Sequence, residues 1–171
     1  CGQALIFPRI QGTDVCGTIV AVGAGVSPAR IGERVLVEPC LVEANGQRLE
    51  QPWYLGSECD GGFAQYTRVA ARHAYPIHLP PSSSMTDAEL ASFPCSYSTA
   101  ENMLTKSQVT DKDTVLITGA SGGVGSAAVQ LACARGARVI AVTRSPDKCQ
   151  ALQALGASQT VDRNNDDLCA I

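Results

Sequence analysis

The chain has 171 residues, of which 45% are hydrophobic and 17% are charged, and its formal net charge is −3. This apolar content is enough for a packed core and argues against a disordered chain. The acidic balance provides no basic patch for nucleic acid, and no apolar run approaches the roughly 18 residues of a membrane span. The opening residues also lack the charged and apolar regions of a signal peptide.

The chain carries eight cysteines, which are scattered and form no C-x-x-C pair. A zinc ribbon needs closely spaced pairs of ligands, so that kind of site is excluded. Disulfide frameworks belong mainly to small secreted domains with little core. We therefore expect reduced thiols, a cytoplasmic location and a small-molecule partner rather than nucleic acid or a membrane.

The part of the chain before about residue 84 has the pattern of short strands and turns. β-branched and apolar residues predict strands over 14–22, 34–38 and 63–69. Residues 43–62 are polar and contain Pro52 and several glycines, which predicts a long surface loop. Short strands separated by turn signals are typical of a small barrel or sandwich.

Residues 85–110 connect this part to the rest and contain two predicted helices. Thr86 and Glu89 have the spacing of a capping box, in which the Thr86 hydroxyl accepts the amide of Glu89 and Glu89 reaches back. The short helix that they open is limited by Pro94, because proline is poorly tolerated inside a helix. A second helix is predicted over 98–104.

After residue 110 the pattern becomes one of alternating strands and helices. Thr114–Ile117 is a continuous apolar run, which predicts a strand buried on both faces. The elements predicted after it are helices over 124–135 and 146–155 and strands over 138–143 and 159–162. Gly136 and Gly156 close the two helices, and Ser145 is the predicted N-cap of the second. This β-α-β-α-β order is the first half of a doubly wound parallel sheet.

Residues 119–125 read Gly-Ala-Ser-Gly-Gly-Val-Gly and lie between the first of these strands and its helix. Glycine permits backbone conformations that a Cβ obstructs and lets a diphosphate approach the main chain, while the helix N-terminus supplies amides and a partial positive charge. The alternative is a structural turn without a ligand. The predicted phosphate-binding residues are Gly119, Ser121, Gly122, Gly123, Val124 and Gly125.

The second strand of this sheet ends without a carboxylate. A site that prefers NAD usually has Asp or Glu there, to accept hydrogen bonds from the ribose hydroxyls. Here Thr143, Arg144 and Ser145 follow one another, with Lys148 one turn on. These side chains suit a 2′-phosphate and favour NADP over NAD as the cofactor. The alternative is that Arg144 and Lys148 are only solvated and that Ser145 is only a cap.

Several stretches taken together resemble the medium-chain dehydrogenase/reductase superfamily, most of all its zinc-free quinone-oxidoreductase-like branch, with zinc-type alcohol dehydrogenases as relatives. The stretches are 11–17 with 21–23, 32–35, 61–66, 93–100, 118–125 and 155–157. The resemblance implies an α/β protein, in which a partial GroES-like β-rich domain over 1–84 precedes the connecting helices of 85–110 and the first half of a Rossmann sheet over 111–171. The homodimer usual in the superfamily uses a strand beyond residue 171, so these residues do not predict it.

The resemblance also bears on zinc. Zinc-type relatives carry a histidine ligand where this chain has Thr13, and their cysteine ligand matches Cys95. Threonine is a poor zinc ligand, and Cys40 and Cys59 are too isolated to form a structural-zinc lobe. We therefore expect no catalytic zinc. Cys95 is a candidate ligand only if zinc is present, and is otherwise a buried thiol.

The candidate catalytic residues are Thr99, Tyr97 and Asp14. The resemblance places Thr99 beside the nicotinamide, although it also begins a helix. Tyr97 is a candidate hydroxyl donor or a packing residue. Asp14 matches the acidic position behind the zinc-type site, with a hydrogen bond inside its own domain as the alternative. Without zinc, the substrate carbonyl is polarised by hydrogen bonds.

The sequence therefore predicts an enzyme that transfers a hydride between NADP(H) and a small carbonyl, enone or quinone. A zinc-dependent alcohol dehydrogenase is the first alternative, against which the absent histidine at position 13 argues. The second is a truncated chain that binds nucleotide without catalysis, because half a dinucleotide fold lacks the nicotinamide half of the crevice.

Overall fold

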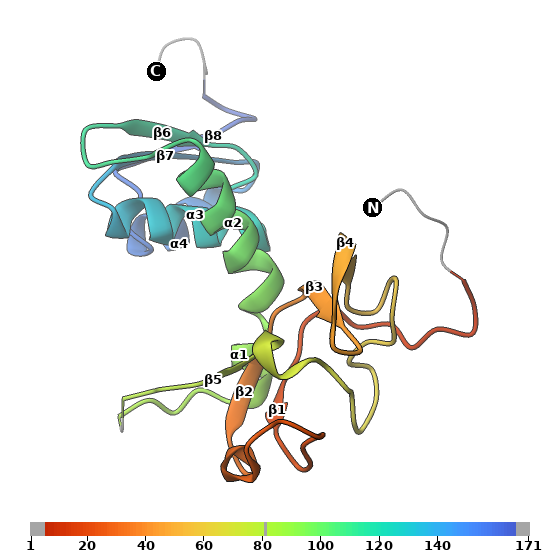
Figure 1. Cartoon of the computed structure of the whole chain (residues 1–171). Coiled ribbons are helices and arrows are strands. Elements are labelled where there is room, and N and C mark those ends of the chain that lie inside the picture. The colour runs from red at the N-terminus through yellow and green to blue at the C-terminus, as the bar shows by residue number, and fades with distance from the viewer. Residues whose placement is uncertain (1–5, 81, 167–171) are drawn as a thin grey trace. The chain divides into compact units, whose positions relative to one another are not determined.

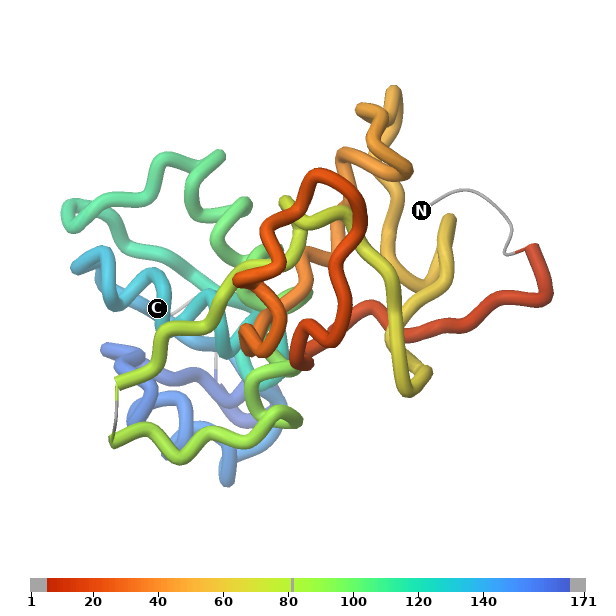
Figure 2. Tube along the Cα trace, turned by 60° about the horizontal axis from the view of Figure 1, so that its bottom comes forward, coloured from red at the N-terminus to blue at the C-terminus, as the bar shows by residue number. Residues whose placement is uncertain are grey.

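The computed structural model of the chain describes residues 6–80 and 82–166. The chain divides between Cys95 and Ser96 into two units, Cys1–Cys95 and Ser96–Ile171. The first unit contains antiparallel sheets, and the second contains a parallel sheet with helices, drawn as arrows and coiled ribbons in Figure 1. Figure 2 follows the Cα trace of the same chain. This order confirms the predicted α/β class, with a GroES-like part followed by the start of a Rossmann-like sheet.

The first unit is organised around a sheet of three short antiparallel strands. These are β1 (Cys16–Thr18), β2 (Arg34–Val37) and β5 (Ala74–Pro76), in the order β1-β2-β5. The central strand β2 alternates, with Val35 and Val37 buried, as expected for a strand with one face on a core. The strand predicted over 14–22 is therefore real but much shorter, and β5 was not predicted.

A second antiparallel pair consists of β3 (Cys40–Ala44) and β4 (Gln47–Tyr54). The prediction of a long loop over 43–62 is wrong for most of its length, because Asn45 and Gly46 make a tight turn with φ of 52° and 74°. Asn-Gly with two positive φ values is the pattern of a type I′ hairpin turn. Leu55, which follows β4, is fully buried beside Val37 and Leu41.

The strand predicted over 63–69 does not form. Phe63 and Tyr66 are 79% and 72% exposed, so their aromatic rings lie outside the core of the unit. The Gly62 N–H donates to the Gly12 carbonyl, and the Phe63 N–H donates to the Gln11 carbonyl. Within the described residues, no β-ladder of backbone hydrogen bonds continues beyond these two. Aromatic and β-branched composition alone therefore misled the prediction, because a strand also needs a partner along its length.

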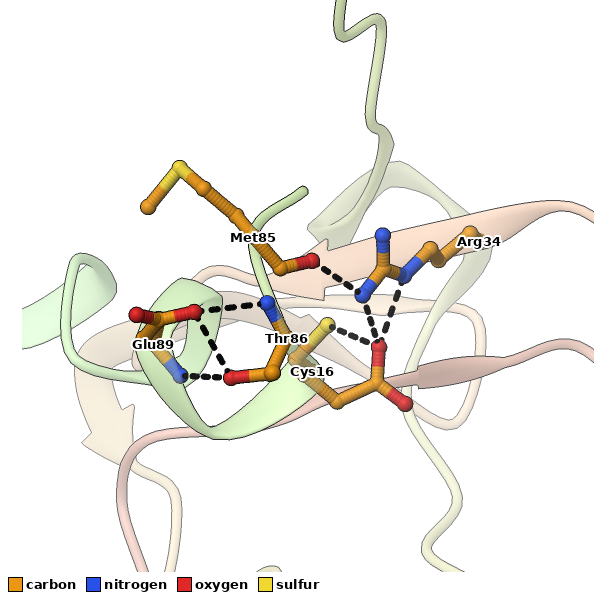
Figure 3. A network of polar contacts seen from close by, with 6 residues as sticks. Cys16, Arg34, Met85, Thr86 and Glu89 are labelled. Atoms are coloured by element: carbon orange, nitrogen blue, oxygen red, sulfur yellow. Dashed lines mark hydrogen bonds and ion pairs between the residues drawn. The ribbon is translucent and has the colours of Figure 1, made fainter. Parts of the chain in front are cut away.

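Helix α1 (Asp87–Ala91) begins at the predicted capping box. The Thr86 hydroxyl accepts the Glu89 amide at 3.2 Å, and the Glu89 carboxylate accepts the Thr86 amide at 2.7 Å (Figure 3). That amide lowers the pKa of Glu89. The Arg34 Nε donates to Asp87 Oδ1 at 2.7 Å and ties the start of the helix to β2. The same guanidinium lowers the pKa of Asp87.

The second unit has the predicted β-α-β-α-β order behind a longer helix than expected. Helix α2 begins at Pro94 rather than near Ser98, because proline is well tolerated in the first turn. The further elements are β6 (Thr114–Ile117), α3 (Gly123–Ala134), β7 (Arg138–Thr143), α4 (Pro146–Ala154) and β8 (Gln159–Asp162). The strands are parallel in the order β6-β7-β8, and α3 and α4 cover the same face of the sheet (Figure 1).

Side-chain burial in this sheet differs between the central strand β7 and the edge strand β6. In β7, Val139 and Ala141 belong to the core under the helices, whereas Ile140 and Val142 form a second cluster with Val161. The prediction that Thr114–Ile117 is buried on both faces is wrong, since Leu116 is 56% exposed. The reason is that β6 is an edge strand of the described sheet.

The ends of these helices follow the sequence signals with one exception. Gly136 and Gly156 have φ of 83° and 110° just after α3 and α4, as C-terminal glycines do. Ser145 is the N-cap residue of α4, but its side chain makes no capping hydrogen bond.

Among the described residues, no helix is both long and apolar enough to cross a membrane. The six cysteines of the described ranges are free thiols.

Candidate functional site

The glycine turn joins β6 to α3 at the carboxyl edge of the parallel sheet. Gly119 has φ of +62°, a backbone conformation that residues other than glycine rarely adopt. A Cβ at Gly125 would lie 2.7 Å from the Ala120 Cα and closer still to the Gly119 carbonyl oxygen. The first glycine is therefore required by the backbone, and the last by the close packing of the helix on the turn.

The N-terminus of α3 is open to an anion. Gly122 is its N-cap residue and provides no side-chain cap, and the first turn contains no acidic residue. The first amide that bonds backwards is that of Ser126, which donates to the Gly122 carbonyl at 2.8 Å. The preceding amides of Gly123, Val124 and Gly125 make none of the described backbone hydrogen bonds. Such a helix start, with glycine at its N-cap and at its first helical position, fits a diphosphate.

The predicted residue Thr143 links this turn to the end of β7. Its hydroxyl is 3.3 Å from the Ser121 hydroxyl, and it accepts the Ser145 amide at 3.4 Å. Thr143 itself is 4% exposed, so its hydroxyl is held within the sheet edge. The structure thus brings together the glycine turn and the segment predicted to bind the adenosine end of a dinucleotide.

The predicted cations lie beside this edge. Arg144 follows β7 directly and is exposed, and Lys148 is exposed in the first turn of α4. Asp147 occupies the same helical turn, where a carboxylate favours the positive end of the helix dipole. Arg144, Lys148 and the half-buried Ser145 are therefore available to a phosphate next to the glycine turn.

Two residues that sequence reasoning missed lie at the end of β8. Asp162 is 7% exposed and is the register partner of Thr143. Its carboxylate accepts the Asn164 amide at 3.1 Å and the Asn165 side-chain amide at 2.6 Å. The Asn164 side chain in turn donates to the Arg144 carbonyl at 3.0 Å. An Asp followed two residues later by Asn is a turn signal that was available in the sequence.

Helix α2 brings one further hydroxyl, that of Ser96, to the glycine turn. A Cβ at Gly123 would lie 2.7 Å from the Ser96 hydroxyl, so this serine, also missed from the sequence, lies against the start of α3. Thr99 is exposed and follows Ser96 by three positions, which puts both on one side of α2. Tyr97 is half-buried, and its hydroxyl accepts a hydrogen bond from Gln130 Nε2 at 2.8 Å. That contact gives Tyr97 a structural partner on α3.

The third predicted catalytic residue, Asp14, lies in the first unit. Its Oδ1 accepts the backbone N–H of Cys95 at 2.8 Å, at the start of α2. A carboxylate in that position satisfies a free helix amide and favours the helix dipole. The observed contact is thus the hydrogen bond inside its own unit that was the alternative to a catalytic role.

The donor set near Asp14 does not fit a catalytic zinc ion. Position 13 is Thr13, which offers a hydroxyl where a zinc site needs an imidazole, thiolate or carboxylate. Cys95 supplies one thiol, and no group of three His, Cys, Asp or Glu side chains is suited to a metal within 6–80 and 82–166. We therefore derive no catalytic step through zinc.

Comparison with known protein families matches both units. Residues 2–80 match the family described as alcohol dehydrogenase GroES-like domain, and residues 123–170 match the family described as zinc-binding dehydrogenase. A crystal structure from Sinorhizobium meliloti 1021, assigned as an alcohol dehydrogenase, superposes with a TM-score of 0.84 at 48% identity. That match covers 97% of this chain and 45% of the other.

Two curated relatives differ in the cofactor that their names state. An NADPH-dependent alkenal/one oxidoreductase of Arabidopsis thaliana chloroplasts is 29% identical over 95% of this chain and 39% of its own length. An NAD-dependent alcohol dehydrogenase of Sulfolobus acidocaldarius is 29% identical over 92% of this chain and 47% of its own length. The chain thus spans about half the length, or less, of the curated relatives it matches.

Proposed function

Because the chain belongs to the medium-chain dehydrogenase/reductase superfamily, we propose that it is part of an oxidoreductase that transfers a hydride between NADP(H) and a small carbonyl, enone or quinone. The observation that carries this proposal is the uncapped start of α3 behind the glycine turn. A dinucleotide is the ligand that such a turn at the carboxyl edge of a parallel sheet serves.

The described residues have distinct tasks in this proposal. The amides of Gly123, Val124 and Gly125 bind the diphosphate, and Thr143 holds the glycine turn against the end of β7. Arg144, Ser145 and Lys148 bind the 2′-phosphate, which carries the preference for NADP. The bound nicotinamide supplies the hydride chemistry, and the protein supplies binding and orientation.

On the substrate side, the proposal relies on hydrogen bonds rather than on a metal. Thr99 is exposed on α2 three residues after Ser96 and is the residue we propose to orient the nicotinamide. Tyr97 and Asp14 have structural partners in Gln130 and in the Cys95 amide, so we propose supporting roles for them. The substrate oxygen is then polarised by hydroxyl or amide donors.

A calorimetric titration tests the cofactor proposal. We expect NADPH to bind the chain more tightly than NADH, and Arg144→Ala to weaken NADPH binding about ten-fold or more while leaving NADH almost unchanged, since it removes charge-assisted hydrogen bonds. Arg138→Ala is the matched control, because Arg138 is an exposed arginine at the opposite end of the same strand. Equal binding of both cofactors, or equal effects of both variants, would contradict the proposal.

A zinc-dependent alcohol dehydrogenase is the second candidate. The name of the family that matches residues 123–170 favours it, as does the thiol of Cys95. Metal analysis of the purified protein separates the two candidates. Stoichiometric zinc that is lost in Cys95→Ser would support the zinc enzyme, whereas substoichiometric zinc unaffected by that variant supports the zinc-free reductase.

A further inference from the structure

The turn that follows β8 is closed on a buried carboxylate. Asp162 is 7% exposed, and its two oxygens accept the Asn164 amide at 3.1 Å and the Asn165 side-chain amide at 2.6 Å. The Asp162 amide donates to the Asp166 carboxylate at 2.8 Å. Since both carboxylate oxygens already hold donors from the turn, Asp162 organises the turn rather than a ribose hydroxyl.

This turn is attached to the segment that carries Arg144. Thr143 and Asp162 are register partners at the ends of the neighbouring parallel strands β7 and β8. The Arg163 amide donates to the Thr143 carbonyl at 2.8 Å, and the Asn164 side chain donates to the Arg144 carbonyl at 3.0 Å. The carbonyl of the last residue of β7, Thr143, and that of the next residue, Arg144, are thus held by two successive residues of the turn.

The second of these hydrogen bonds fixes the peptide group that follows Arg144. Arg144 is exposed and lies just beyond the last residue of β7, where the β-ladder no longer constrains it. A guanidinium on a fixed backbone loses less conformational freedom when it meets a phosphate than one on a free loop. The contact therefore acts on a ligand through Arg144 and does not require Asn164 to touch that ligand.

We propose that Asn164 is a positioning residue that holds Arg144 for the 2′-phosphate of NADP(H). The inference rests on the proposed cofactor preference and adds to it a determinant in the turn that follows β8, outside both the glycine turn and the end of β7. Asp162 supports this contact, because its carboxylate accepts a hydrogen bond from the Asn164 amide and so fixes the Asn164 backbone.

Isothermal titration of NADPH and NADH against five forms of the chain tests the inference. The forms are the unchanged chain, Arg144→Ala, Asn164→Ala and the double variant, with Asn165→Ala as the matched control. Asn165 belongs to the same turn and contacts Asp162, whereas Asn164 contacts Arg144. Circular dichroism of each form checks that it is folded.

We expect Asn164→Ala to weaken NADPH binding about five-fold, as for one neutral hydrogen bond, with less than a two-fold change for NADH. The double variant is expected to bind NADPH no more weakly than Arg144→Ala alone, because Asn164 acts through Arg144. Asn165→Ala is expected to change NADPH binding less than Asn164→Ala does.

The outcomes separate the inference from the cofactor proposal. If Arg144→Ala weakens NADPH binding but Asn164→Ala does not, or if their effects are additive, the positioning role is overturned and the cofactor proposal stands. Equal effects of the two asparagine variants also overturn it, because the turn as a whole would then be responsible. If Arg144→Ala leaves NADPH binding unchanged, both the positioning role and the cofactor proposal are overturned.

Discussion

Two glycines of the same turn are expected to respond differently to alanine. At Gly125 an added Cβ would lie 2.7 Å from the Ala120 Cα, and this neighbour is backbone that cannot swing away. Overpacking of this kind costs about 1–3 kcal/mol, so we expect Gly125→Ala to lower the free energy of unfolding by about 2 kcal/mol. Urea denaturation followed by circular dichroism measures this loss.

Gly122→Ala is the matched control in the same turn. Gly122 has φ of −84° and ψ of 171°, which alanine adopts freely, and its Cβ would meet only the Gly119 carbonyl oxygen at 3.4 Å. We expect its free energy of unfolding to stay within about 0.5 kcal/mol of the unchanged chain. Its methyl group would stand at the open start of α3, so NADPH binding should weaken about ten-fold or more.

Either of the two glycine variants can contradict these expectations. If Gly125→Ala unfolds at the same urea concentration as the unchanged chain, the close packing of α3 on the turn is not as the structure describes. If Gly122→Ala binds NADPH as tightly as the unchanged chain, the amides of this turn do not hold the diphosphate, and the proposed function loses its main support.

Two further predictions concern the first unit. Burial, with Arg72 acting in the same direction, lowers the pKa of His73, whose Nε2 accepts the Val42 amide. The unfolded chain therefore takes up the proton first, and stability should fall as pH decreases below about 6.5 until the folded pKa is reached. His73→Gln should remove this part of the pH dependence in urea titrations, while His78→Gln should retain it; an unchanged profile in His73→Gln would contradict the assignment. Thr86→Ala should lower the free energy of unfolding by about 1 kcal/mol through loss of the capping box, and a loss below about 0.3 kcal/mol would show that the cap contributes little.

The parts of the fold that the sequence predicts well are those encoded by neighbouring residues. The capping box at Thr86, the glycine turn and the β-α-β-α-β order each depend on a short stretch, and each is present in the structure. The Asn45-Gly46 hairpin was equally local, but its turn signal was outweighed by the polar composition around it.

The parts that the sequence did not predict depend on partners distant along the chain. Whether 63–69 forms a strand depends on a neighbour with which to pair, and whether Leu116 is buried depends on the position of β6 within the sheet. The contact between Asn164 and Arg144 likewise follows from the register of β7 and β8. Of the candidate site, the glycine turn and the residues at the end of β7 were predicted from sequence, whereas Ser96, Asp162 and Asn164 were not.

The open flank of β6 marks the side on which the described sheet can be extended. One side of this strand carries peptide donors and acceptors that no neighbouring strand of the described sheet engages, and Leu116 adds an exposed apolar side chain beside them. Such an edge is a template on which a further strand can add, as the second half of a doubly wound sheet does next to its first strand.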